Sequence, residues 1–286
     1  MNKELIIRSN SSAVDFALLK DGKLIELNQE IEDNKFSVGD IFVGKIRKSV
    51  PGLNAAFVNV GYEKDGFLHY HDLGPKLPSL VKYIKQVSTG KNKDYLLKQF
   101  RYENDIDKDG NIGDILSPKQ TVLVQIVKEP ISTKGPRLSS EISLAGRYMV
   151  LMPFSDRVSI SQKIEDKAEK SRLKKLVQSI KPKGFGLIIR TVAEGQKVAS
   201  LDADIQQLLT RWKNLSSKLK QIDKFPTKVL SEINRSSSIL RDIFDSSFTG
   251  IYVDDAEIQN ELRDYLETIA PEKRSIVKLY ENHLPI

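Results

Sequence analysis

The sequence of 286 residues contains no cysteine, so disulfide bonds and thiolate metal sites are excluded. No stretch reaches the ~18 consecutive apolar residues that a membrane-spanning helix needs. The amino terminus, MNKELIIRSNSSAVDF, lacks the apolar segment of a signal peptide. Together these absences predict a cytoplasmic protein without a membrane partner.

Residue groups that carry catalysis are equally scarce. His69 and His71 lie on one face of a predicted strand but have no third metal ligand near them in the sequence. Asp254 and Asp255 follow another predicted strand, yet no further carboxylate completes a nuclease metal site. No arrangement of serine and histidine resembles a nucleophile with its base. The sequence therefore predicts no catalytic residue, no metal site and no cofactor in this chain.

Charge and length are more informative than these absences. Lysine and arginine number 45 against 38 aspartates and glutamates, which gives a net charge of +7. A positive excess favours a polyanionic partner. Hydrophobic residues make up 40% and charged residues 29%, which is typical of a folded chain. The length predicts two or three domains.

The segment from Asp40 to Leu68 carries the main functional signal. Two apolar runs with strand character, Ile41–Ile46 and Ala55–Val60, flank a basic stretch that begins at Lys45. Phe57 and Phe67 follow within and after the second run. Bases of single-stranded RNA stack on such rings while cations follow the phosphates, which predicts an RNA-binding barrel of OB type. The alternative is that both rings are buried in the barrel core.

The barrel is expected to open at Phe36 and to end with the strand Thr121–Val127. Ser132–Ser143 follows, and in it Lys134 and Arg137 place two cations on a Gly-Pro turn, where they suit a backbone phosphate. An ordinary solvated connection fits this segment equally well.

Residues 73–120 form a stretch that is too long for an ordinary barrel loop, so we expect an insertion with a short helix at Asp94–Phe100. Three carboxylates in it are spaced as in an EF-hand calcium loop, with the required glycine after them: Asp105, Asp107, Asp109 and Gly110. The glutamate that should complete the calcium site is replaced by Leu116. A flexible acidic loop is therefore expected.

The head and the tail of the sequence together predict one discontinuous domain. Three short strands with tight turns come first: Leu5–Ser9, Ala13–Leu19 and Lys23–Leu27. The tail predicts a helix, a strand, a helix and a strand: Ser237–Phe244, Gly250–Val253, Ala256–Ile269 and Ile276–Tyr280. This is the element order of an RNase H-like fold, interrupted by everything from Phe36 to about Arg235.

The region after Ser139 predicts an α/β arrangement. Its elements are a strand, a helix, a strand and a long amphipathic helix: Ser159–Ser161, Ile164–Ile180, Leu187–Val192 and Leu201–Ile222. Arg190 and Thr191 end the second strand. A guanidinium beside a hydroxyl suits the oxygens of a terminal phosphate, although an exposed strand end explains the same pair.

Several motifs in one order resemble the amino-terminal half of the bacterial ribonuclease E/G family. They are Gly44-Lys-Ile46, Asn54-Ala-Ala-Phe-Val-Asn-Val-Gly61, Gly66-Phe-Leu68, Lys134-Gly135, Ile142–Pro153, Gly186-Leu-Ile-Ile-Arg-Thr191 and Lys278-Leu-Tyr280. The resemblance implies an RNase H-like domain (1–35 plus 236–286), an OB-fold domain (36–138, with the insertion 73–120) and a 5′-sensor subdomain (139–235).

The resemblance also implies residue roles. Phe57, Phe67 and Lys134 match RNA-contacting barrel positions, to which the chemistry above adds Lys45. In the family's 5′-monophosphate pocket, Arg190 and Thr191 would bind the phosphate, Gly146 would offer its backbone N–H, and Val150 would pack against the terminal nucleotide. A monophosphate pocket discriminates against a triphosphate by bulk and charge.

In that family a following DNase I-like domain cleaves RNA with magnesium held by two aspartates, and this sequence stops before it. We therefore expect a chain that binds single-stranded, 5′-monophosphorylated RNA without cutting it, and whose oligomerisation depends on the missing carboxyl-terminal part. Two alternatives stay open. One is a metal-dependent nuclease that uses Asp254, Asp255 or the carboxylates of residues 105–114, and the other is a protein-interaction scaffold in RNA decay.

Overall fold

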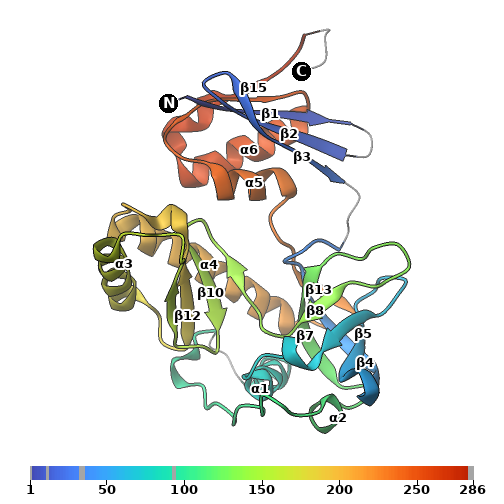
Figure 1. Ribbon diagram of the computed structural model, residues 1–286. Coiled ribbons are helices and arrows are strands. Elements are labelled where there is room, and N and C mark those ends of the chain that lie inside the picture. The colour runs from blue at the N-terminus through green and yellow to red at the C-terminus, as the bar shows by residue number, and fades with distance from the viewer. Residues whose placement is uncertain (1, 11–12, 32–35, 92–94, 283–286) are drawn as a thin grey trace. The chain divides into compact units, whose positions relative to one another are not determined.

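The computed structural model describes residues 2–10, 13–31, 36–91 and 95–282. The chain divides into two compact units, Met1–Lys35 with Ile233–Ile286, and Phe36–Glu232. Both units combine helices with strands (Figure 1), which confirms the predicted mixed α+β class. The finer division into three domains stays a prediction. In the four described ranges, no helix is long and apolar enough to cross a membrane.

The discontinuous unit is built on a five-stranded sheet in the order β15-β14-β1-β2-β3. Its strands are β1 (Lys3–Ser9), β2 (Ala13–Lys20), β3 (Lys23–Ile31), β14 (Phe248–Val253) and β15 (Val277–Leu279). The first three strands form an antiparallel meander, whereas β14 runs parallel to β1 and β15 parallel to β14. Strands from the head and the tail of the sequence therefore share one sheet, as expected.

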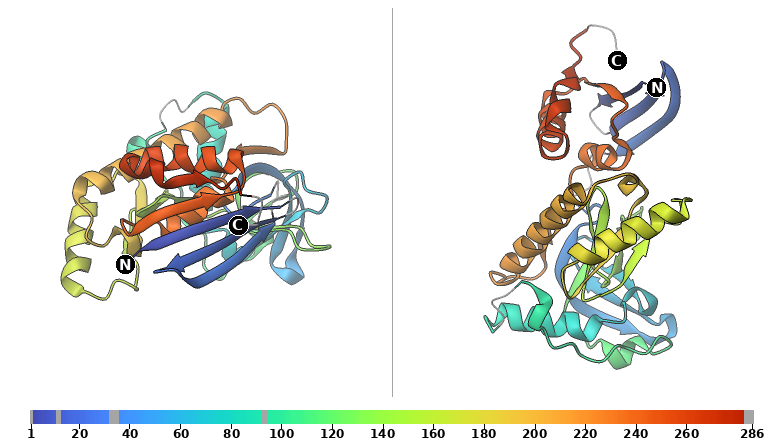
Figure 2. Two further views of the ribbon diagram at one scale, coloured as in Figure 1. Left: turned by 90° about the horizontal axis from the view of Figure 1, so that it is seen from above. Right: turned by 90° about the vertical axis from the view of Figure 1, so that its left-hand side faces the viewer.

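Alternating apolar residues decide which face of this sheet is covered. Leu5, Ile7 and Phe16 are buried against the helices, because successive side chains of a strand point to opposite faces. Figure 2 shows α6 (Ala256–Ile269) along one face of the sheet. The other helical segments of the unit are α5 (Arg235–Ile243) and the 3-10 helix η5 (Pro271–Ile276).

The second unit contains a closed five-stranded barrel of OB type. Its strands are β4 (Ile41–Val50), β5 (Ala55–Asn59), β6 (Gly66–His69), β7 (Thr121–Lys128) and β8 (Arg137–Ser139). The order β4-β5-β6-β8-β7 closes through pairing of β4 with β7. A further strand, β13 (Thr227–Leu230), pairs with the start of β4. Short helical turns connect the barrel strands: η1 (Pro51–Leu53), η2 (Tyr70–Asp72) and α2 (Ile112–Ile115).

A four-stranded sheet in the order β11-β12-β10-β9 completes this unit. Its strands are β9 (Leu144–Ala145), β10 (Met149–Pro153), β11 (Val158–Ile160) and β12 (Phe185–Ile189). The helices α3 (Lys167–Ile180) and α4 (Val198–Leu219) pack on the sheet and on each other, and η4 (Thr191–Ala193) follows β12. This sheet is where the candidate phosphate-binding residues lie.

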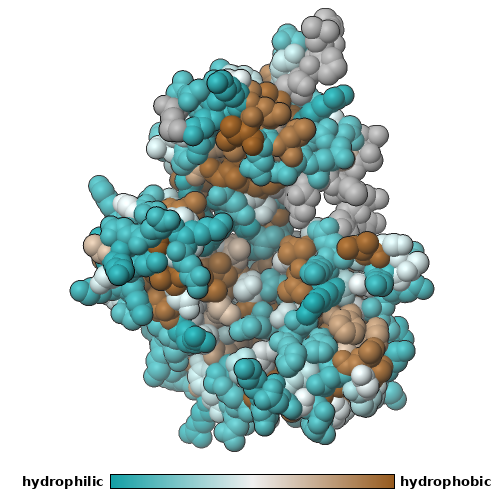
Figure 3. Space-filling model, viewed as in Figure 1, coloured by the Kyte–Doolittle hydropathy of each residue, from teal (hydrophilic) through white to brown (hydrophobic). Residues whose placement is uncertain are grey.

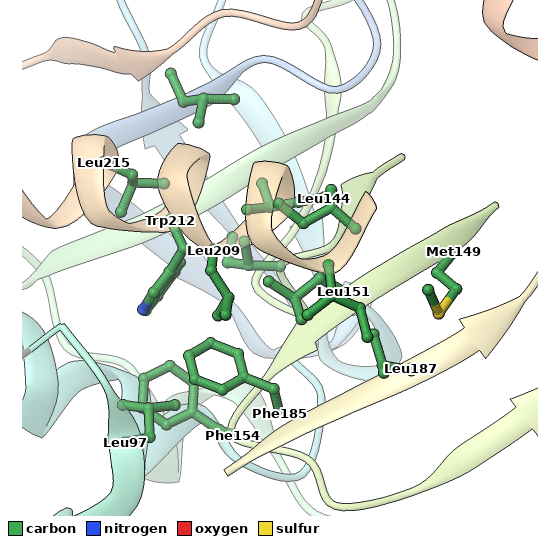
Figure 4. Close-up of a cluster of buried hydrophobic side chains, with 14 of the residues drawn as sticks. Leu97, Leu144, Met149, Leu151, Phe154, Phe185, Leu187, Leu209, Trp212 and Leu215 are labelled. Atoms are coloured by element: carbon green, nitrogen blue, oxygen red, sulfur yellow. The ribbon is translucent and has the colours of Figure 1, made fainter. Parts of the chain in front are cut away.

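One continuous hydrophobic core joins the barrel to this sheet. Trp212 of α4 is fully buried and lies among Leu97, Phe154 and Phe185 (Figure 4). Its ring stacks on Tyr83 with centroids 5.5 Å apart, and its Nε1 donates to the Tyr95 carbonyl at 2.9 Å. Barrel residues belong to the same cluster: Ile41, Val43 and Leu123.

The structure corrects the prediction for residues 73–120. The long helix of this stretch is α1 (Leu77–Ser88), and residues 95–100 contain only the 3-10 turn η3 (Leu97–Gln99), while Asp94 lies outside the described residues. Helix α1 buries Leu80, Tyr83 and other side chains at helical spacing in the core. Pro78 is compatible with this helix because proline is well accommodated in the first turn.

Smaller corrections concern where elements begin and end. Helix α3 starts at Lys167 rather than Ile164, because Asp166 caps it by accepting a hydrogen bond from Ala168 N–H at 2.8 Å. Strand β12 ends at Ile189, and Arg190 already precedes a 3-10 turn. Four strands were not predicted from the sequence: β8, β9, β10 and β13. All of them are short, so few residues are available to show an alternating pattern.

Candidate nucleic-acid interface

Phe57 and Phe67 lie on the outer face of the barrel. The residues that alternate with them, Val58 on β5 and Leu68 on β6, are fully buried, whereas the two phenylalanines are half-buried. They are direct partners in the strand register, and their ring centroids lie 5.8 Å apart at an interplanar angle of 71°. The alternative that both rings fill the barrel core is therefore wrong.

Two imidazoles extend this pair into an aromatic row, which we define as Phe57, Phe67, His69 and His71. The His69 ring lies 6.3 Å from Phe67, and the His71 ring lies 5.1 Å from His69. Figure 3 shows apolar surface over β4 and β5 with hydrophilic residues around it. In the sequence alone, these histidines had indicated only a metal site without its third ligand.

Two lysines of β4 meet different rings. Lys48 Nζ lies 5.1 Å from the Phe57 centroid, so a cation stands beside the aromatic row. Lys45 is exposed, but its Nζ lies 4.8 Å from the ring of Phe225. The structure thus places Lys48 against Phe57, and the contact of Lys45 with RNA phosphates stays a prediction.

Lys134 lies on a turn that is fixed next to Phe67. The Phe67 N–H donates to the Pro136 carbonyl at 2.8 Å, and Lys134 itself is exposed. Gly135 has to be glycine here, because an added Cβ would stand 2.2 Å from the Asp65 carbonyl oxygen. The turn that carries Lys134 is therefore anchored to β6, the strand of Phe67.

Arg137, the second cation predicted for this turn, is engaged within the protein. Its guanidinium makes two hydrogen bonds to the Asp72 carboxylate, at 2.9 and 3.2 Å. This pairing raises the pKa of Arg137 above its ordinary value. We therefore leave Arg137 out of the candidate interface.

The four residues predicted for a phosphate pocket come together at one end of the second sheet. Arg190 and Thr191 directly follow β12, Val150 lies on the neighbouring β10, and Gly146 lies in the turn between β9 and β10. Arg190 Nη1 donates to the Gly146 carbonyl at 2.8 Å. All four are half-buried. Folding therefore brings these separated residues together around the Arg190 guanidinium and the Thr191 hydroxyl.

One detail of the expected pocket differs in the structure. The Gly146 N–H, expected to face a phosphate, donates to the Met149 carbonyl at 2.8 Å and closes the turn. The Thr191 hydroxyl shares a hydrogen bond of 2.9 Å with the hydroxyl of Ser161, a residue that the sequence had not indicated as part of the site. Ser161 therefore belongs to the same polar group.

Asp204 of α4 is the other residue that the sequence analysis missed. It is buried, and its carboxylate accepts hydrogen bonds from the backbone of Arg147, Tyr148 and Met149, each at 2.9 Å. Burial raises the pKa of Asp204, although these three hydrogen bonds and the charge of Arg190 act in the opposite direction. A signal existed, because Asp204 interrupts the apolar stripe of a helix predicted to be amphipathic.

The remaining carboxylates of interest have structural partners. Asp254 accepts a hydrogen bond from Ser9 N–H at 2.7 Å, and Asp255 caps α6 by accepting from Glu257 and Ile258. Asp105 pairs with Lys76 at 2.5 Å. Within the part of the chain that the structure describes, no three histidine or carboxylate side chains are grouped closely enough to hold a metal ion.

The fold and the site define an OB-type barrel with outward aromatic rings, joined to a sheet that presents an arginine and a threonine. Comparison with known proteins places this combination of domains in a ribonuclease family. The model of the Ribonuclease E/G family matches residues 143–286. Ribonuclease G of Haemophilus influenzae is 31% identical over 285 residues, which are 99% of this chain and 54% of that protein.

Ribonuclease G of Escherichia coli K12 is 31% identical over 286 residues, which are 100% of this chain and 54% of that protein. Ribonuclease E of Nostoc is 32% identical over 268 residues, or 93% of this chain and 34% of that protein. The chain therefore belongs to the ribonuclease E/G family. It spans about half the length of the ribonuclease G relatives.

Proposed function

We propose that this chain is the RNA-binding and 5′-end-sensing portion of an endoribonuclease that acts on single-stranded RNA in processing and decay. The observation that carries the proposal is the presence of two complementary surfaces in one compact unit. One is the outward pair Phe57 and Phe67, and the other is the group around Arg190 and Thr191. Membership in the ribonuclease E/G family supports it.

The barrel surface would hold the RNA chain. Bases stack on aromatic rings with about 1–3 kcal/mol per base, and the contact tolerates any base because every base has a flat face. Lys48 beside Phe57 and the exposed Lys134, on the turn anchored to β6, would supply charge for the backbone phosphates. Such a surface binds single strands with little sequence preference.

The second surface would read the end of the RNA. Arg190 offers a planar cation and Thr191 a hydroxyl, which together suit the oxygens of a terminal monophosphate. Val150, on the strand paired with β12, would pack against the first nucleotide. A triphosphate would bring additional bulk and charge that these few groups do not match.

We assign the discontinuous unit to an RNase H-like, non-catalytic domain. The support is its strand order, in which a three-stranded antiparallel meander is extended by two parallel strands. Asp254 and Asp255 are occupied with anchoring β1 and capping α6, which argues against a nuclease centre there. Cleavage by magnesium chemistry and oligomerisation would then depend on the rest of a protein of the relatives' length.

The test compares two forms of one RNA oligonucleotide, with a 5′-monophosphate and with a 5′-hydroxyl, by fluorescence anisotropy. We expect tighter binding of the monophosphate by about tenfold, since hydrogen bonds to a charged group are worth about 1.5–3 kcal/mol. Arg190→Ala should remove the difference. Arg101→Ala, which deletes an exposed arginine elsewhere in the same unit, is the matched control.

Equal affinity for the two forms would overturn end sensing. Failure to bind either form would overturn the whole proposal and favour a protein scaffold. Cleavage of the RNA by this chain in magnesium, lost in Asp254→Asn or Asp255→Asn, would establish the nuclease alternative instead.

A further inference from the structure

A single buried carboxylate holds the turn between β9 and β10. The Asp204 side chain comes from α4 and is only 6% exposed. Its Oδ1 accepts from Arg147 N–H, and its Oδ2 accepts from Tyr148 and Met149 N–H. A buried carboxylate has to replace its hydration with hydrogen bonds, and here three consecutive amides supply them. The backbone of the turn is therefore tied to the helix.

Gly146 is part of the same arrangement. A Cβ on Gly146 would stand 2.7 and 2.8 Å from the two Asp204 oxygens, so only glycine allows the carboxylate to approach this closely. The helix holds the turn at a second point as well, because Arg211 Nη1 donates to the Ala145 carbonyl at 2.9 Å. Asp204 and Arg211 of α4 thus both hydrogen-bond to the backbone of residues 145–149.

Arg190 is attached to this turn twice. Its backbone N–H donates to the Tyr148 carbonyl at 2.8 Å, and its Nη1 donates to the Gly146 carbonyl at 2.8 Å. The guanidinium is therefore oriented by the Gly146 carbonyl, which belongs to the turn whose next three amides bind Asp204. Orientation matters because a planar guanidinium recognises phosphate oxygens through directional hydrogen bonds.

We propose that Asp204 is the positioning residue of the phosphate site, holding the 146–149 turn so that Arg190 is aligned for a 5′-monophosphate. The inference rests on the proposed function, since it takes the Arg190 and Thr191 group to be a phosphate site. A negative charge near a phosphate opposes its binding, so the three amides, rather than contact with the ligand, explain an aspartate at this position.

The first test uses Asp204→Asn, which keeps the volume of the side chain but replaces one acceptor oxygen with a donor. The readout is the ratio of dissociation constants for the 5′-hydroxyl and 5′-monophosphate oligonucleotides. We expect the wild-type ratio of about tenfold to fall to within about twofold of unity, with 5′-hydroxyl affinity nearly unchanged. Asp202→Asn, on the same helix but half-buried, should keep the wild-type ratio.

The second test needs no ligand. Amide hydrogen exchange of Arg147, Tyr148 and Met149, followed by NMR, should be slow in the wild type and at least about tenfold faster in Asp204→Asn. Gly146→Ala offers an independent route if Asp204→Asn does not fold, because its methyl group displaces the carboxylate without removing it. It should abolish discrimination too.

Three results would overturn the inference alone: a variant that keeps the wild-type ratio, a variant that binds the monophosphate more tightly because repulsion dominated, or amides that stay protected. A wild-type ratio of unity would instead overturn the proposed function and this inference together. The two failures are therefore distinguishable from the wild-type measurement.

Discussion

Phe57 and Phe67 face each other across β5 and β6, with ring centroids 5.8 Å apart, and neither ring enters the barrel core. Because both are held by strand pairing, their positions do not depend on a mobile loop. Rings on rigid strands are suited to stacking, since little conformational entropy is lost when a base binds.

We predict that Phe57→Ala and Phe67→Ala each weaken RNA binding by about tenfold, in line with about 1–3 kcal/mol per stacked base. The loss should be equal for 5′-hydroxyl and 5′-monophosphate oligonucleotides, because the barrel does not read the end. Anisotropy titrations measure it. Phe57→Tyr keeps a ring and should bind as the wild type does; unchanged affinity in both alanine variants would contradict the prediction.

The salt dependence of RNA affinity should change when Lys134 is replaced but not when Arg137 is replaced. Each phosphate contact on a single strand contributes about −0.7 to the slope of log affinity against log salt. Lys134→Gln should therefore make the slope shallower by roughly this amount. Arg137→Gln breaks an internal pair with Asp72, so it should lower the stability of the fold and leave the slope as it is. Identical slopes for the wild type and Lys134→Gln would exclude a phosphate contact.

We predict that the hydrogen bonds of Glu169 in α3 make part of the stability of the fold sensitive to acid. Hydrogen bonds from Arg172, at 2.6 Å each, and from Gly195 N–H, at 2.8 Å, lower the pKa of Glu169 to about 2. Its folded-state pKa lies below the unfolded value of about 4.3, so its contribution to stability is complete above that pH and is lost as the pH falls towards 2.

Glu169→Gln should accordingly lower stability at pH 6 and make the unfolding midpoint less dependent on pH between about 5 and 2. Urea unfolding followed by circular dichroism measures this. Glu165→Gln, an exposed residue just before the same helix, is the control. A Glu169→Gln profile parallel to that of the wild type would refute this role of Glu169.

The core around Trp212 predicts a large stability effect. Replacing a fully buried tryptophan by alanine costs about 3–5 kcal/mol, because it leaves a cavity among Tyr83, Phe154 and Phe185. Trp212→Phe should cost less, since it keeps part of the ring but leaves the Tyr95 carbonyl without its donor. Chemical denaturation measures both; a loss of less than about 1 kcal/mol for alanine would contradict this packing.

Many elements of the fold could be predicted from local sequence patterns. The meander β1 to β3 follows from alternating apolar residues and a tight turn at Asp21 and Gly22, both with positive φ. Helix α6 was predicted with the bounds that the structure shows, and Asp255 caps its start. Helix α1 could have been predicted as well, since its buried side chains recur at helical spacing.

Most of the residues of the candidate sites could be predicted from the sequence, but their orientation and partners could not. The spacing of Phe57 and Phe67 was visible in the sequence, but whether they face outward depends on strand register. The partners of charged groups were not visible either. Arg137 pairs with Asp72 across 65 residues, and Asp204 meets the turn at Arg147 across 57 residues. No local pattern encodes such distant pairs.

The sequence by itself determined most of the strands and helices, the positive charge, the absence of thiol chemistry and the motifs of the ribonuclease E/G family. The elements, the charge and the absence of thiols follow from residue composition and from periodicity over a few residues, whereas the motifs are read as residue identities in a fixed order. Only the tertiary structure decided which cations face solvent, that the Gly146 amide closes a turn, and that Asp204 holds this turn next to Arg190. The reason is physical: burial and hydrogen-bond partners depend on chain segments that folding brings together from distant positions.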